Sequence, residues 1–189
     1  MLVLGISGSP RRNGNTEILL DEALKSAGEA GADTEKVILQ KMKFSPCIAC
    51  GSCDNTGICV LKDDMQELYE KIIAADALIV STPIYFYNVS ACLKAAIDRA
   101  QALWARRYYL KEPLLLKDKP GYLISVGATK GKRLFKGTIL TIRYYYNAAG
   151  YVLADQLLVR GVDNKGDINK HPEYLKAAAE IGRLAAQGK

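Results

Sequence analysis

Short apolar runs alternate along the chain with segments in which apolar residues recur at helical spacing. The short runs predict strands, which are expected at residues 2–6, 34–39, 77–81, 120–126 and 151–159. The segments with helical spacing predict helices at residues 15–31, 63–74, 90–103, 138–146 and 172–186. In the second of these helices, Asp63 and Gln66 have the spacing of a capping box.

Two segments need a separate interpretation. Residues 104–118 are basic and aromatic, and Pro113 would break a long helix there, so we expect an irregular connection. Residues 138–146 have the β-branched and aromatic content of a strand, yet several of their apolar residues share one helical face. We choose a helix because a parallel sheet requires a crossover at this point.

The repeated alternation of strand and helix predicts an α/β fold. We expect one domain over residues 1–189, with a doubly wound five-stranded parallel sheet, helices on both faces, and a cysteine-rich loop inserted at about residues 43–62. Such folds bind ligands at the carboxyl ends of their strands. The loops that follow predicted strands are therefore expected to gather on one rim; they are residues 7–16, 43–60, 82–88 and 127–131.

Composition and charge narrow the class of protein. The apolar share of 49% and the charged share of 24% are ordinary for a globular domain, and no apolar run approaches a membrane span. The N-terminal residues lack the pattern of a signal peptide, so we expect a cytoplasmic protein. The net charge is +6, and nine basic residues lie between Arg106 and Lys136. They form either a solvated face or a docking patch for an acidic protein or an anionic dinucleotide. Nucleic acid is a disfavoured partner, because no recognised nucleic-acid-binding module accompanies the charge.

Residues 7–16 link a strand to a helix through glycine, serine, asparagine and threonine. Such a turn presents free N–H groups and hydroxyls to an anion, and the helix dipole adds to the attraction. The candidate donors are Ser7, Ser9, Asn15 and Thr16, with Arg11 supplying charge. The segment is neither a P-loop nor a G-x-G-x-x-G loop. The alternative is an ordinary polar turn before a capped helix.

This loop resembles the phosphate loop of the flavodoxin-like NAD(P)H-dependent FMN reductases, in which a Ser-x-Ser-x-Arg segment ending in Asn-Thr holds the FMN phosphate. Residues 83–88, Pro-Ile-Tyr-Phe-Tyr-Asn, match the family segment that lies along the isoalloxazine ring, and residues 93–99 match the helix that follows. A flat apolar ring favours aromatic walls, which Tyr85 and Phe86 would supply. Core packing is the alternative role for these two aromatic residues.

Four of the five cysteines, Cys47, Cys50, Cys53 and Cys59, fall within 13 residues. A disulfide framework and a structural zinc site are alternatives, but the compact spacing fits a cubane iron-sulfur cluster better. The remaining cysteine, in the helix at 90–103, is expected to be a buried packing residue. With a single histidine in the chain, a catalytic triad is disfavoured and the chemistry should belong to cofactors.

The C-x2-C-x2-C-x5-C pattern within a flavodoxin-like chain resembles the iron-sulfur flavoproteins, and residues 127–137 extend the resemblance. It implies a 4Fe-4S cluster on the four clustered cysteines and FMN at the rim of the sheet. The FMN-binding residues would be Ser7, Ser9, Arg11, Asn13, Asn15, Thr16, Pro83, Ile84, Tyr85, Phe86, Asn88, Gly127, Ala128, Thr129 and Lys130.

The resemblance also implies electron transfer from a reduced donor, an acidic ferredoxin, through the cluster to FMN and on to dioxygen or peroxide. It implies an anaerobic source and a homodimer or homotetramer in which one subunit's cluster approaches its neighbour's FMN. Two alternatives stay open. One is an NAD(P)H-dependent FMN or quinone reductase without a cluster. The other is a non-enzymatic flavin-binding redox sensor whose cysteines hold zinc or cycle as thiols.

Overall fold

A computed structural model describes residues 1–189 and contains one sheet of five parallel strands. In sequence order the strands are β1 (Leu2–Ser7), β2 (Asp33–Ile38), β3 (Ala77–Pro83), β4 (Lys119–Gly127) and β5 (Tyr151–Arg160). Their order across the sheet is β2-β1-β3-β4-β5, and every neighbouring pair is parallel. The predicted doubly wound α/β fold is confirmed.

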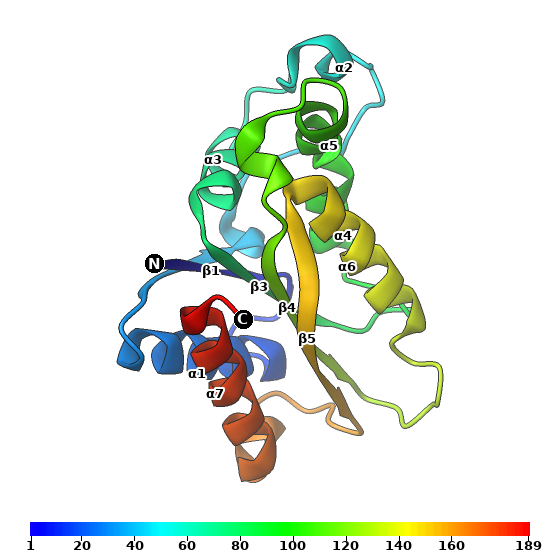
Figure 1. The fold of residues 1–189 in the computed structure, drawn as a ribbon. Coiled ribbons are helices and arrows are strands. Elements are labelled where there is room, and N and C mark those ends of the chain that lie inside the picture. Colours follow the sequence, from blue (N-terminus) through cyan, green and yellow to red (C-terminus); the bar gives the residue numbers. More distant parts are fainter.

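Helices cover both faces of the sheet (Figure 1). One face carries α1 (Asn15–Glu29) and α7 (Pro172–Gln187); the other carries α3 (Met65–Ala74), α4 (Ala91–Arg99), α5 (Gln101–Tyr108) and α6 (Lys136–Ala149). The shorter helices are η1 (Leu39–Lys41), α2 (Cys53–Thr56), η2 (Pro113–Leu116) and η3 (Asp167–Lys170).

Alternation along the strands divides the core between these two layers. In β1, Val3 packs with the residues of α1 and α7, whereas Leu4 packs with those of the other layer, because successive strand side chains point to opposite faces. Gly182 allows α7 to lie close on α1, since a Cβ there would stand 2.0 Å from the carbonyl oxygen of Ala23. The helix chosen for residues 138–146 is confirmed as part of α6.

The irregular connection expected at residues 104–118 is wrong in its first part, which belongs to α5. Pro113 does not interrupt this helix, because it lies beyond its end and begins η2. The guanidinium of Arg107 holds the segment in place: it is buried, donates to the carbonyl of Leu115 and pairs with Asp118 at 2.6 Å. At least one basic residue of the segment 104–118, Arg107, therefore has a structural role.

The capping box expected at the start of α3 is also wrong. Asp64 occupies the N-cap position, and Asp63 accepts the N–H of Met65 at 3.2 Å. The side-chain amide of Gln66 turns away to donate to the carbonyls of Cys59 and Leu61, at 3.3 and 2.9 Å. The side chain therefore fastens the end of the cysteine loop to α3. No helix in the structure combines the length and apolar character needed to cross a membrane.

Candidate functional site

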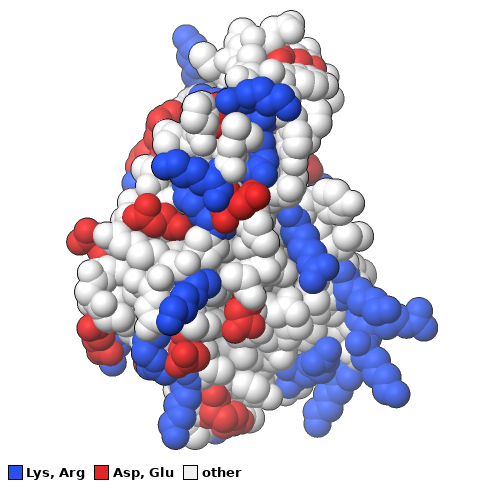
Figure 2. Space-filling model, viewed as in Figure 1, with Lys and Arg blue, Asp and Glu red and all other residues white.

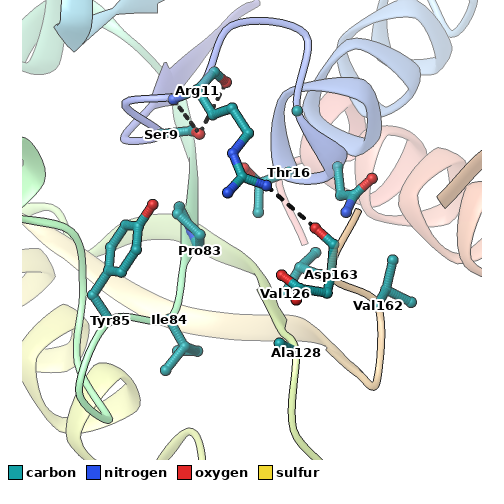
Figure 3. A pocket seen from close by; sticks show the side chains of 12 residues that line it. Ser9, Arg11, Thr16, Pro83, Ile84, Tyr85, Val126, Ala128, Val162 and Asp163 are labelled. Atoms are coloured by element: carbon teal, nitrogen blue, oxygen red, sulfur yellow. Dashed lines mark hydrogen bonds between the residues drawn. The ribbon is translucent and has the colours of Figure 1, made fainter. Parts of the chain in front are cut away.

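A pocket opens at the carboxyl ends of β1, β3 and β4, between the loop before α1 and the loop after β5 (Figure 3). Eight residues expected from the sequence line it: Ser9, Arg11, Asn15, Thr16, Pro83, Ile84, Tyr85 and Ala128. Four lining residues were not predicted: Gly14, Val126, Val162 and Asp163. The last two follow β5, so the rule that ligands bind at the carboxyl ends of strands would have found them.

The loop between β1 and α1 offers free donors at a helix N-terminus. The backbone N–H groups of Asn15, Thr16 and Glu17 have no acceptor within the chain, and no side chain caps the helix. The hydroxyl of Ser9 accepts the N–H of Arg11 at 3.1 Å and donates to its carbonyl at 3.0 Å, which fixes the bend of the loop. Unpaired amides and the helix dipole together favour a bound anion.

Asn15 lines the pocket as predicted, and its side chain also contacts the loop after β5. Its side chain donates to the carbonyl of Asn164 at 3.0 Å and accepts the N–H groups of Gly166 and Ile168 at 3.0 and 3.3 Å. Its amide therefore ties the loop after β5 to α1. Arg11 closes the same side of the pocket, where its guanidinium donates to the carbonyl of Asp163 at 3.3 Å (Figure 3).

The loop at residues 8–14, between β1 and α1, is called the anion-binding loop below. A buried carboxylate, that of Glu17, lies next to it in the first turn of α1. Glu17 accepts the N–H of Asn13 at 2.7 Å and pairs with Lys36 at 3.3 Å and with Arg12 at 3.6 Å. Burial alone would raise the pKa of Glu17, but the amide of Asn13 and the ammonium of Lys36 lower it below its ordinary value. Asn13, in a left-handed conformation at φ 51°, thus shapes the loop and does not line the pocket.

A tight hairpin forms the opposite wall of the pocket. Tyr85 and Asn88 exchange two backbone hydrogen bonds, at 2.9 and 3.0 Å, around Phe86 and Tyr87. These two aromatic residues have φ values of 49° and 63°, the left-handed conformations of a type I′ turn that glycine and asparagine usually adopt. The ring of Tyr85 faces the pocket in Figure 3, whereas the side chain of Phe86 is fully exposed.

Contacts with α6 hold this hairpin in position. The side-chain oxygen of Asn88 accepts the N–H of Val89 at 2.8 Å and the hydroxyl of Thr141 at 3.0 Å. Gly137 permits the approach, because a Cβ there would lie 2.5 Å from the carbonyl oxygen of Tyr87. Asn88 therefore acts on the pocket through the hairpin and does not line it.

The remaining predicted residues lie around the pocket without lining it. Ser7 is buried at the end of β1 with an unpartnered hydroxyl, and the carbonyl of Gly127 accepts a backbone hydrogen bond from the loop after β5. Thr129 and Lys130 are exposed in the loop between β4 and α6. Figure 2 shows lysine and arginine side chains gathered at the edge of the molecule where Figure 1 places this loop.

The four clustered cysteines, Cys47, Cys50, Cys53 and Cys59, line a second pocket together with residues of α4 and α5. All four are free thiols. The hydroxyl and amide of Ser52 lower the pKa of Cys50, whereas burial and the charge of Asp54 raise that of Cys53. No group of three or more His, Cys, Asp or Glu side chains in the structure is close enough together to hold a metal ion.

The cysteine pocket does not lie on the rim expected from the sequence. At the start of α4, Ser90 and Cys92 donate to the carbonyl of Gly8 in the anion-binding loop, whereas Arg99 at the end of α4 lines the cysteine pocket. The nine residues of α4 span about 13 Å, so the two pockets are separated by roughly that length. Figure 1 shows α2 beside α5, at the far end of this helical layer. Cys92 packs against the core as expected, but it is half-buried and not fully buried.

Comparisons with known proteins agree with the chemistry of these pockets. The family model described as NADPH-dependent FMN reductase matches residues 1–159. An iron-sulfur flavoprotein of Methanocaldococcus jannaschii is 37% identical, over 99% of this chain and 96% of its own. The iron-sulfur flavoprotein of Methanosarcina thermophila is 39% identical, over 81% of this chain and 76% of its own.

Among solved structures, an NAD(P)H:quinone oxidoreductase from Methanothermobacter marburgensis superposes with a TM-score of 0.78. The match covers 97% of this chain and 95% of that one at 20% identity, which shows a shared fold. The sequence matches extend the likeness to the family level, since they include the anion-binding loop and the cysteine loop. The chain therefore belongs to the NADPH-dependent FMN reductase family, among the iron-sulfur flavoproteins, and is an FMN-dependent oxidoreductase.

Proposed function

We propose that this protein passes electrons from a reduced donor, through a 4Fe-4S cluster, to FMN and on to an acceptor such as dioxygen or peroxide. The observation that carries the proposal is the presence in one chain of an anion-binding pocket with an aromatic wall and of a separate pocket lined by four free thiols. Bound FMN would supply the redox chemistry, and the protein would bind and orient it.

The first pocket has the groups that FMN requires. The free amides at the start of α1 and the hydroxyl of Ser9 would hold its phosphate. Pro83, Ile84 and Tyr85 would lie along the flat ring, with the chain after β4 on the other side. Since the amides of α1 are unpaired in the protein alone, a phosphate there satisfies donors that otherwise depend on water.

The second pocket has the donor set of an iron-sulfur cluster. The thiols that line it are those of Cys47, Cys50, Cys53 and Cys59, and no histidine lines it. The loop turns through left-handed conformations at Ala49, Gly51 and Gly57, which allow a short segment to wrap around one object. Binding would require these thiols to draw together and ionise.

We further propose a homodimer or homotetramer in which one subunit's cysteine pocket faces its neighbour's FMN. One feature supports this arrangement. Phe86 and Tyr87 expose apolar surface beside the FMN pocket that a second subunit would cover. Sedimentation should give an oligomer that Phe86→Ser weakens; a fully active monomer at micromolar concentration would contradict this.

The electron donor is proposed to be an acidic ferredoxin that docks on the basic loop between β4 and α6. Reversal of two exposed charges, Lys132→Glu with Arg133→Glu, should slow reduction about tenfold at low salt and flatten its salt dependence, because attraction between opposite charges accelerates encounter. Lys176→Glu, on α7, is the matched control and should change little. Equal rates in the double variant and the wild type would sink this assignment.

An NAD(P)H-dependent FMN or quinone reductase is the second candidate, favoured by the family description and by a basic loop near the pocket that suits an anionic dinucleotide. Anaerobic stopped-flow kinetics with reduced ferredoxin and with NADPH separates the two. Faster reduction by ferredoxin supports the proposed function, and faster reduction by NADPH supports the second candidate. A protein reduced by neither would instead be a flavin-binding redox sensor.

A further inference from the structure

Arg99, the last residue of α4, is a fully buried arginine that holds both ends of the cysteine loop. One terminal nitrogen donates to the carbonyl of Ser45 at 2.8 Å and to Asp63 at 2.7 Å. The other donates to the carbonyl of Leu61 at 3.3 Å and to Asp63 at 3.0 Å. Ser45 precedes the first clustered cysteine and Leu61 follows the last, so one guanidinium fastens the loop where it begins and where it ends.

The third donor of this guanidinium has no partner. The Nε–H of Arg99 is buried and makes no hydrogen bond within the chain. Native proteins seldom leave such a buried donor unpaired without a reason. Arg99 lines the same pocket as all four cysteines, whose sulfur atoms can accept a hydrogen bond there.

We propose that Arg99 is a positioning residue for the cluster, whose Nε–H donates a hydrogen bond to a sulfur atom of the group that the four thiolates hold. This inference rests on the proposed function. The charge of Arg99 is already paired with Asp63, so its effect on the cluster comes from the hydrogen bond and from the fixed position of the loop. A hydrogen bond to sulfur stabilises the more negative, reduced cluster and raises its reduction potential.

The direct test uses selectively labelled protein. Two samples are prepared anaerobically, one with ¹⁵N at the arginine Nε and one with ¹⁵N at both terminal nitrogens, and the reduced cluster is examined by pulsed electron paramagnetic resonance. We expect a ¹⁵N hyperfine coupling from the Nε label that exceeds any from the terminal label. A fully loaded cluster without this coupling overturns the role of Arg99 alone. A protein without iron and sulfide overturns the proposed function as well.

Variants assign the signal to one arginine. Arg106 is the matched control, because its Nε donates to the carbonyl of Gly57 in the same loop at 2.8 Å but the residue does not line the cysteine pocket. Arg99→Lys should abolish the Nε coupling and shift the cluster to a more negative potential, whereas Arg106→Lys should retain both. Loss of the coupling in Arg106→Lys would contradict the assignment. Because the wild-type labelling decides on its own, the test survives failure of Arg99→Lys to fold.

Discussion

Replacing Asp63 with asparagine removes the charged partner of the buried Arg99 while preserving side-chain size. The carboxylate accepts two charge-assisted hydrogen bonds from the guanidinium, at 2.7 and 3.0 Å, and also accepts the N–H groups of Ser45 and Met65, each at 3.2 Å. In Asp63→Asn, an amide N–H₂ would face a guanidinium that has only donors to offer. Arg99 would then be buried without a counter-charge.

The expected loss follows from these contacts. Each hydrogen bond to a charged group contributes about 1.5–3 kcal/mol, and breaking a buried ion pair on one side typically costs about 3–5 kcal/mol. Because the Asp63 side chain is 17% exposed, water relieves part of the loss. We therefore expect the free energy of unfolding to fall by about 3 kcal/mol.

Urea unfolding followed by circular dichroism measures this difference, with Asp64→Asn as the matched control. The exposed carboxylate of Asp64 accepts only the N–H of Lys43, at 2.6 Å, and asparagine retains an acceptor for it. The free energy of unfolding of Asp64→Asn should therefore lie within about 0.5 kcal/mol of that of the wild type. If Asp63→Asn is no less stable than Asp64→Asn, the ion pair with Arg99 does not hold the loop.

The same difference should depend on pH in a defined direction. Burial would raise the pKa of Asp63, but its hydrogen bonds with Arg99 and with backbone amides lower the pKa below the ordinary value of 3.8. A carboxyl whose pKa is depressed by folding stabilises the protein fully above its unfolded pKa and loses that contribution as the pH falls through the folded value. The gap between the wild type and Asp63→Asn should be constant near neutral pH and shrink below about pH 4.

Two further predictions concern the FMN pocket. Gly137→Ala should push the hairpin away from α6, because a Cβ would lie 2.5 Å from the carbonyl oxygen of Tyr87. The variant should therefore bind FMN about tenfold more weakly in a fluorescence titration. Gly131→Ala, where the nearest contact is the Tyr87 hydroxyl at 3.7 Å, should bind FMN normally, and equal affinities would refute the role of the hairpin. Ser9→Ala should weaken FMN binding about three- to tenfold in the same titration, and unchanged affinity would remove its hydroxyl from the site.

The strands and most helices were predictable because their signals are local. Apolar runs and helical spacing identify buried elements without knowledge of their partners, and the need for a crossover correctly decided α6. The loops after β1, β3 and β4 were placed correctly at the first pocket for a similar reason: parallel strands bring their carboxyl ends to one edge. That rule requires only the order of elements.

The cysteine loop was misplaced because the same rule says nothing about long connections. It follows β2, but it lies at the far end of α4, and Arg99 and Gln66 both donate to the carbonyl of Leu61 at its C-terminal end. The contact of Arg99 with Leu61 joins residues 38 positions apart in the sequence, and no local pattern marks it. The contacts of Asn15 with the loop after β5 were likewise not predictable, since its side chain bonds to residues about 150 positions away.

The central claim is that one chain carries both FMN and an iron-sulfur cluster on Cys47, Cys50, Cys53 and Cys59. Protein purified without exposure to oxygen should be analysed for FMN, iron and acid-labile sulfide, alongside a variant with serine at all four positions. We expect FMN together with about four irons and four sulfides per chain, and FMN without iron in the variant. Full FMN occupancy without iron or sulfide in the wild-type protein would contradict the account.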